Sequence, residues 1–232
     1  MNIIALSPVY GRPDEYYQDK LRYLHPYLPS FVNIQYRPLP CGFPSIESEY
    51  HAASNSAALL EQVEKASKEK NADGIFIDCF DDPAVTAARE ISPLPVCGPY
   101  DASIKAASLI SSDIGIITTD DYGISCERRK ALAHGYSHFI RDIKPIGSRV
   151  LNLSSIDMAE RIFELAQEFE KKAIYTVILG CTGMYLQAEE AQQKLTAAGS
   201  PVQIIEPLRT GILSLIMLIS GNYTTAMPYA TV

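Results

Sequence analysis

The chain has 232 residues, 47% hydrophobic and 20% charged, with a formal net charge of −7 at pH 7. This is an ordinary globular composition, which argues against a disordered, collagen-like or low-complexity chain. The negative charge argues against a nucleic-acid partner, because a phosphate backbone would repel it. The first residues do not resemble an export signal, and no apolar run reaches the length of a membrane span. We therefore expect a cytoplasmic protein with no membrane partner.

The first half of the chain alternates short apolar runs with longer amphipathic stretches. Pro83 suits the first turn of a helix, and Asp101 suits a helix cap. The predicted strands are residues 3–8, 31–36, 75–77 and 95–97, and the predicted helices are residues 15–24, 55–70, 83–90 and 101–109.

The second half repeats the same order of elements. The predicted strands are residues 114–117, 139–146, 175–179 and 202–205, and the predicted helices are residues 122–133, 155–171, 184–198 and 208–219. A strand followed by a helix, repeated about eight times, predicts a parallel α/β fold.

The two halves match in pattern and not in residue identity, and each has a cysteine after its third strand. We therefore expect two pseudo-symmetric lobes, each a roughly four-stranded parallel sheet flanked by helices. The predicted first lobe comprises residues 1–98 and 206–232, and the second comprises residues 99–205. No Gly/Ser-rich linker separates them, which predicts closely packed lobes.

Five cysteines, widely spaced and without a CxxC pair, argue against a zinc finger or a disulfide framework. Cys79 and Cys181 stand out because each follows a buried strand and precedes a helix. Ligands of open α/β sheets bind outside the carboxyl ends of the strands, and a helix N-terminus favours a thiolate. The neighbouring Asp81 and Asp82 oppose a thiolate at Cys79. The other three cysteines, Cys41, Cys97 and Cys126, are predicted to be packing or surface residues.

A pair of thiols on two matching halves suits the inversion of a carbon stereocentre. One thiolate removes a proton from one face of the carbon, and a thiol on the other side returns a proton to the opposite face. A cysteine pKa near 8.5, modestly lowered, makes both forms accessible at neutral pH.

Several segments resemble the Asp/Glu/hydantoin racemase superfamily, and most closely its hydantoin/allantoin racemase branch. The resemblance covers essentially the whole chain. It rests on the two cysteine regions, residues 77–83 with 87–90 and residues 179–184, and on residues 42–48 and 116–119.

The resemblance implies a cofactor-independent racemase of a cyclic ureide, either a 5-substituted hydantoin or allantoin, with no metal. It places the active site in the cleft between the lobes and makes Cys79 and Cys181 the catalytic bases. Hydroxyl and backbone donors would stabilise the enolate charge that develops beside a carbonyl. The implied donors are Thr118, Thr119, Thr182 and Gly183, and the other implied substrate-binding residues are Pro8, Tyr10, Phe80 and Asp81.

The chain departs from the family pattern after its first strand, where Ser7-Pro8-Val9-Tyr10 replaces the usual Asn-Pro-Asn. Thr182 also stands where alanine is common, so the substrate can differ from a simple hydantoin. The same scaffold could serve an aspartate or glutamate racemase, a maleate isomerase or an arylmalonate-type decarboxylase. A non-catalytic small-molecule binding protein is a further alternative. Beyond a small-molecule substrate, the expected partner is a second copy of the chain in a homo-oligomer.

Overall fold

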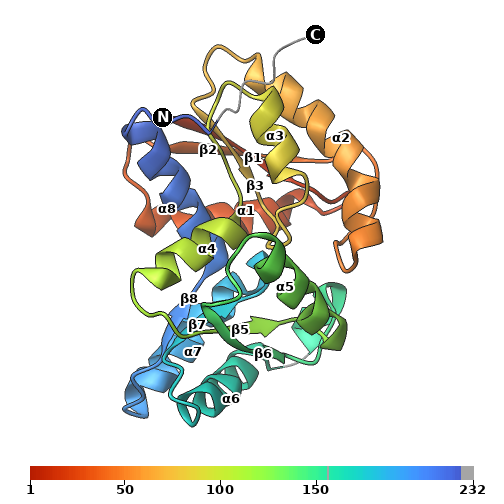
Figure 1. Cartoon of the computed structure of the whole chain (residues 1–232). Helices are drawn as coiled ribbons and strands as arrows, with labels where there is room; N and C mark the ends of the chain where they lie inside the picture. The colour runs from red at the N-terminus through yellow and green to blue at the C-terminus, as the bar shows by residue number, and fades with distance from the viewer. Residues whose placement is uncertain (156, 226–232) are drawn as a thin grey trace. The chain divides into compact units, whose positions relative to one another are not determined.

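The computed structural model describes residues 1–155 and 157–225 (Figure 1). The chain forms two compact units: unit 1 is Met1–Asp101 with Gly211–Val232, and unit 2 is Ala102–Thr210. Both boundaries fall inside helices, α4 (Pro99–Ser108) and α8 (Pro207–Ser220). The chain therefore passes between the units through regular helices and not through linkers. Within the described residues, no helix is both long and apolar enough to cross a membrane.

Unit 1 is built on a parallel sheet with the strand order β2-β1-β3-β4. Its strands are β1 (Asn2–Ser7), β2 (Asn33–Pro38), β3 (Gly74–Ile77) and β4 (Val96–Cys97). Its helices are α1 (Asp14–Leu24), the short 3-10 turn η1 (His25–Tyr27), α2 (Glu49–Ser67), α3 (Val85–Ile91) and parts of α4 and α8.

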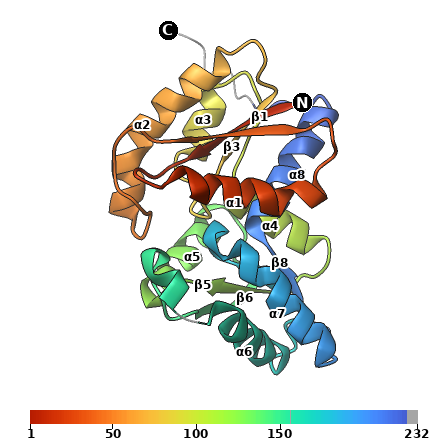
Figure 2. The same cartoon turned by 180° about the vertical axis from the view of Figure 1, so that it is seen from behind.

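The helices of unit 1 cover both faces of this sheet (Figures 1 and 2). On one face, Leu6 and Ile77 belong to a core cluster with Leu59 of α2 and Ala88 of α3. On the other face lie α1, which Figure 2 brings to the front, and α8, whose Gly211 lies against the ring of Phe76. A sheet covered on both faces explains why β3 reads as a continuous apolar run.

Unit 2 repeats this topology with the strand order β6-β5-β7-β8, again all parallel. Its strands are β5 (Ile114–Thr118), β6 (Ile140–Pro145), β7 (Thr176–Leu179) and β8 (Gln203–Ile205). Its other elements are α5 (Asp121–Ala133), α6 (Met158–Glu170), α7 (Tyr185–Ala197) and the 3-10 turns η2 (Val150–Ser155) and η3 (Thr182–Met184). The predicted parallel α/β fold with two four-stranded lobes is confirmed.

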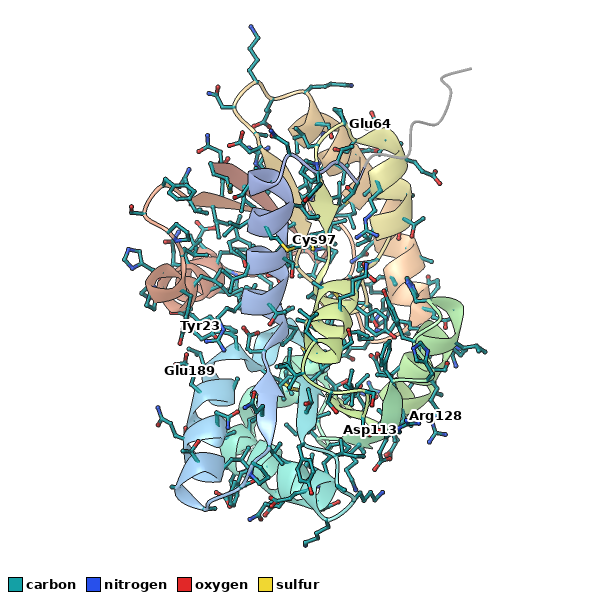
Figure 3. All side chains as sticks on the ribbon, turned by 60° about the vertical axis from the view of Figure 1, so that its left-hand side comes forward. Tyr23, Glu64, Cys97, Asp113, Arg128 and Glu189 are labelled. Atoms are coloured by element: carbon teal, nitrogen blue, oxygen red, sulfur yellow. The ribbon has the colours of Figure 1, made fainter. Side chains whose placement is uncertain are left out.

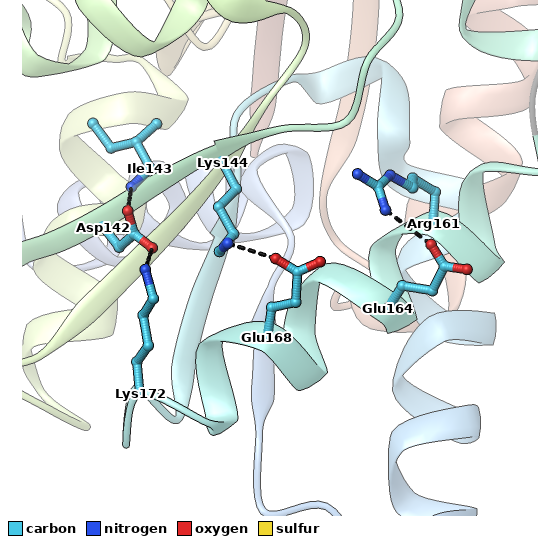
Figure 4. Close-up of polar contacts among 7 residues, drawn as sticks. All are labelled: Asp142, Ile143, Lys144, Arg161, Glu164, Glu168 and Lys172. Carbon is cyan, nitrogen blue, oxygen red and sulfur yellow. Dashed lines mark hydrogen bonds and ion pairs between the residues drawn. The ribbon is translucent and has the colours of Figure 1, made fainter.

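The face of this second sheet that carries Ile117 and Leu179 packs on α6 and α7 in one apolar cluster. At the edge of the sheet, β6 is joined to α6 and the turn after it by ion pairs (Figure 4). Lys144 lies 2.5 Å from Glu168, and Lys172 lies 2.8 Å from Asp142.

Three predicted helix starts are wrong. Helix α3 begins at Val85 and not at Pro83, because Ala84 has a left-handed φ of 55° that no α-helix contains. Asp101 does not cap its helix but lies inside α4. Helix α6 begins at Met158, where the side chain of Asp157 accepts the N–H of Glu160, and not at Ser155.

Two other elements are displaced from their predicted residues. Helix α2 begins at Glu49, six residues before its predicted start, because the hydroxyl of Ser48 caps it by accepting the N–H of His51 at 3.1 Å. Strand β2 is displaced toward higher residue numbers, and Phe31, its predicted first residue, is an exposed side chain outside the sheet.

Candidate active site

Cys79 lies just beyond the carboxyl end of β3, in the middle of the first sheet. The N–H of Asp78 donates to the carbonyl of Leu6 at 2.9 Å and so extends the pairing of β1 with β3. Cys79 is half-buried, and Phe80 beside it is buried with its ring 5.3 Å from that of Tyr100. Because parallel neighbours end at the same edge of a sheet, the segments after β1 and β3 lie together.

A buried ion pair lies directly before Cys79. Nζ of Lys20, on α1, is 2.6 Å from Oδ2 of Asp78, and the two side chains are only 1% and 0% exposed. Burial lowers the pKa of the Lys20 ammonium, but its interactions with Asp78 and Tyr16 together leave the pKa above its ordinary value. Lys20 is therefore a cation. Oδ1 of Asp78 has no hydrogen-bond partner among the described residues.

Tyrosines of α1 and β2 surround this pair. The Lys20 ammonium lies 4.7 Å from the centre of the Tyr16 ring, and the rings of Tyr17 and Tyr36 stack at 5.3 Å. Burial raises the pKa of the Tyr17 hydroxyl above its ordinary value. The Tyr17 hydroxyl is therefore neutral at physiological pH. The role of Lys20 could not be predicted, because a lysine in an amphipathic helix has the sequence pattern of a solvent-facing residue.

The segment after β1 is held by one buried amide. Asn55 of α2 is 1% exposed. Its Nδ2 donates to the carbonyl of Pro8 at 2.9 Å, and its Oδ1 accepts the N–H of Phe43 at 2.9 Å. The N–H of Tyr10 donates to the carbonyl of Phe43 at 3.0 Å. Pro8 is buried and Tyr10 is 48% exposed. Asn55 thus joins two segments that are distant in sequence, residues 7–10 and 42–48.

Cys181 occupies the equivalent place in unit 2, just beyond β7. The N–H of Gly180 donates to the carbonyl of Ile117 at 2.7 Å, and a Cβ at Gly180 would lie 2.9 Å from that oxygen. Only glycine allows this close approach. Cys181 is half-buried against the apolar cluster, and its Sγ accepts the N–H of Gly183 at 3.3 Å. A donor aimed at sulfur stabilises the thiolate form.

The predicted hydroxyl donors lie at the same edge of the second sheet. Thr118 ends β5 next to Gly180. Thr118 and Thr182 are buried, whereas Thr119 is half-buried, so Thr119 is the most exposed residue of the three. The carbonyl of Thr119 accepts the N–H groups of Gly147 and Ser148, both at 3.0 Å, which ties it to the loop after β6.

The predicted site residues thus fall into two groups. One group follows β1 and β3 in unit 1: Pro8, Tyr10, Cys79, Phe80 and the half-buried Asp81. The other lies at the end of β5 and just beyond β5 and β7 in unit 2: Thr118, Thr119, Cys181, Thr182 and Gly183. Their roles toward a ligand stay predictions.

The remaining cysteines lie elsewhere. Cys97 is buried in β4 (labelled in Figure 3), Cys41 is exposed, and Cys126 is half-buried in α5 with its Sγ 3.4 Å from Nη2 of Arg129. In the part of the chain that the structure describes, no three His, Cys, Asp or Glu side chains are grouped so that they could hold a metal ion.

Comparison with known proteins decides the family. The model of the Asp/Glu/hydantoin racemase family matches residues 14–215. The chain belongs to the Asp/Glu/hydantoin racemase family. The hydantoin racemase of Rhizobium meliloti is 28% identical over 185 residues, which are 78% of this chain and 74% of that protein. The hydantoin racemase of Paenarthrobacter aurescens is 27% identical over 189 residues, 78% of this chain and 76% of that protein.

Among solved structures, the allantoin racemase from Klebsiella pneumoniae has the same fold as this family member. The TM-score is 0.87 at 23% sequence identity, and the match covers 97% of this chain and 90% of that one. The named relatives are racemases, and racemases are isomerases, so the prediction of an isomerase of this family is confirmed.

Proposed function

We propose that the protein is a cofactor-independent racemase of a cyclic ureide, a 5-substituted hydantoin or allantoin, with Cys79 and Cys181 as its two bases. One observation carries the proposal: each cysteine lies two residues beyond the third strand of a sheet, in two units of identical strand order. The names of the hydantoin and allantoin racemases that resemble the chain support the substrate class.

The chemistry needs one thiolate and one thiol on opposite faces of the substrate carbon. The thiolate removes the proton from C5 and becomes a thiol, and the electron pair of the broken C–H bond delocalises into the adjacent carbonyl. The other thiol then donates its proton to the opposite face and becomes the thiolate. The next turnover, in the reverse direction, restores the first state, so no cofactor is consumed.

The transient enolate needs hydrogen-bond donors close to the oxygen on which the charge develops. We assign this role to the hydroxyl of Thr119, because Thr119 is more exposed than the buried Thr118 and Thr182. The N–H of Gly183 donates to Cys181, so its primary role in this proposal is to stabilise that thiolate.

Racemisation of enantiopure substrates tests the proposal. Each enantiomer of 5-benzylhydantoin and of allantoin is incubated with the protein in the presence of EDTA, and the loss of circular dichroism is compared with buffer alone. We expect loss of signal from both enantiomers of at least one ureide. Aspartate, glutamate, maleate and phenylmalonate are assayed in parallel. Turnover of these compounds without turnover of either ureide would contradict the proposed substrate class. Ureide binding without turnover would contradict the enzyme and support a binding protein.

A further inference from the structure

The loop that carries Cys79, residues 78–84, has an unusual backbone. Asp82 has a φ of 46° and Ala84 a φ of 55°, both in the left-handed region that favours glycine. Two such residues, separated by a single proline, persist only where the surrounding structure holds them. Strain of this kind is typical of functional loops, and it requires an explanation in the contacts of the loop.

The carboxylate of Asp82 supplies one such contact. Its Oδ1 accepts the N–H of Tyr100 at 3.0 Å and its Oδ2 accepts the N–H of Asp101 at 3.1 Å, both at the start of α4. A Cβ at Gly98 would lie 2.3 Å from Oδ1, so glycine leaves the room that this carboxylate occupies. The N–H of Asp82 in turn donates to the carbonyl of Cys79 at 2.9 Å. Asp82 thus connects Cys79 to α4, because its backbone N–H binds Cys79 and its side chain binds α4.

The second unit shows that a helix in this position needs no such long-range cap. Helix α8 follows β8 as α4 follows β4, and its first N–H groups are capped by Glu206, the residue just before the helix. The carboxylate of Glu206 accepts the N–H groups of Leu208 and Arg209, each at 2.7 Å. In unit 1 the equivalent carboxylate comes from the cysteine loop. The Asp82 carboxylate therefore stabilises the cysteine loop as well as the start of α4.

The opposite end of the loop is held by the buried ion pair of Asp78 with Lys20, at 2.6 Å. Carboxylates thus fix the loop on both sides of Cys79, one to α1 and one to α4. We propose that Asp82 is a positioning residue for Cys79: its bonds to α4 hold the loop in the conformation that orients the thiol. The catalytic meaning of this role rests on the proposed function, but the structural tie does not.

The test reads Cys79 directly, without a substrate. The alkylation rates of Cys79 and Cys181 by iodoacetamide are measured in the same molecules by peptide mass spectrometry, so that Cys181 is an internal control. Asp82→Ala removes the carboxylate, whereas Gly98→Ala keeps its charge but displaces it from α4. Glu206→Ala is the matched control, because it removes the corresponding cap of α8. All rates are compared under conditions in which circular dichroism shows each variant folded.

We expect the ratio of Cys79 to Cys181 alkylation to rise at least fivefold in both Asp82→Ala and Gly98→Ala, and to stay within twofold of the unmodified protein in Glu206→Ala. Asp82→Asn, which keeps one acceptor oxygen and perturbs folding least, should give a smaller rise. A change in Asp82→Ala but not in Gly98→Ala would mean that charge alone acts, and would overturn the proposal. Unchanged ratios in Asp82→Asn and Gly98→Ala would also overturn it.

Racemisation separates this inference from the proposed function. With an active ureide, Asp82→Ala should lower kcat at least tenfold and leave KM within about twofold, because a misplaced thiol reacts slowly with a substrate that still binds. A raised alkylation ratio in a protein that racemises no ureide would support the tie and contradict the proposed function. An unchanged alkylation ratio in a protein that racemises a ureide would contradict the positioning role of Asp82 and support the proposed function.

Discussion

At the scale of single residues, the buried pair of Lys20 and Asp78 has a direct consequence for stability. Removing two charges from water is costly, and only their mutual attraction compensates for it. Both side chains are essentially inaccessible to solvent. The loss of one partner is therefore far more damaging than the loss of both.

Lys20→Met should destabilise the protein by roughly 3–5 kcal/mol, because it leaves the Asp78 carboxylate buried and unpaired. The double variant Lys20→Met with Asp78→Leu should recover most of that loss. Urea denaturation measures both. Lys68→Met, in an exposed pair with Glu64 at 4.0 Å, is the control and should change little. A double variant no more stable than Lys20→Met would contradict the account.

The ion pair of Lys144 with Glu168 makes a pH-dependent contribution to the stability of the fold (Figure 4). The hydrogen bond from Lys144 lowers the pKa of Glu168 below its usual value. A lowered folded-state pKa stabilises the fold above the unfolded-state pKa, and this stabilisation is lost as the pH falls through the folded-state pKa.

Glu168→Gln should therefore cost less than about 1 kcal/mol at pH 7, since the carboxylate is 43% exposed. The difference from the unmodified protein should disappear below the folded-state pKa of Glu168, in the acidic range. Urea midpoints measured from pH 7 down to pH 3 test this. A difference that stays constant over this range would show that the charge is not involved.

At the scale of elements, close contacts between strands and helices explain where glycines are needed. Gly115 lies in β5, and a Cβ there would lie 2.7 Å from the ring of Phe169 on α6. Phe169 is fully buried, so its ring has no space into which to move.

Gly115→Ala should destabilise the protein by about 1–3 kcal/mol through this overlap. Adding Phe169→Leu should cost less in the Gly115→Ala background than it does alone, because the smaller side chain relieves the overlap. Thermal or urea unfolding of the unmodified protein, the two single variants and the double variant measures the interaction between the two substitutions. Additive effects would show that the two side chains do not compete for space.

The elements themselves could be predicted from the sequence because their signals are local. The apolar run of residues 75–77 predicted β3, and the amphipathic stretch of residues 15–24 predicted α1. The capping of α4 could not be predicted, because Asp82 lies 18 residues before Tyr100, the first N–H that it binds. The left-handed backbone at Ala84 carries no glycine to signal it, which explains the misplaced start of α3.

At the scale of the whole molecule, the repeated architecture was predictable because both halves alternate short apolar runs with amphipathic stretches. The prediction that Cys79 and Cys181 follow the third strand of each sheet agrees with the bounds of β3 and β7. The environment of each thiol was not predictable. Cys181 receives an N–H from Gly183, whereas Cys79 lies between Asp78 and Asp82, whose partners are distant in sequence. The pseudo-symmetry of the fold thus coexists with two different cysteine environments. The expected homo-oligomer stays a prediction, which light scattering of the purified protein would test.

Solvent deuterium incorporation tests the two-thiol mechanism. One enantiomer of the active ureide is converted in D2O, and the product and the remaining substrate are separated and analysed by mass spectrometry at early times. A two-thiol mechanism predicts deuterium at C5 of the product and protium in the remaining substrate, with no conversion above the buffer rate when both Cys79 and Cys181 are replaced by alanine. Racemisation that survives the double replacement, or an inverted product without deuterium, would contradict the account.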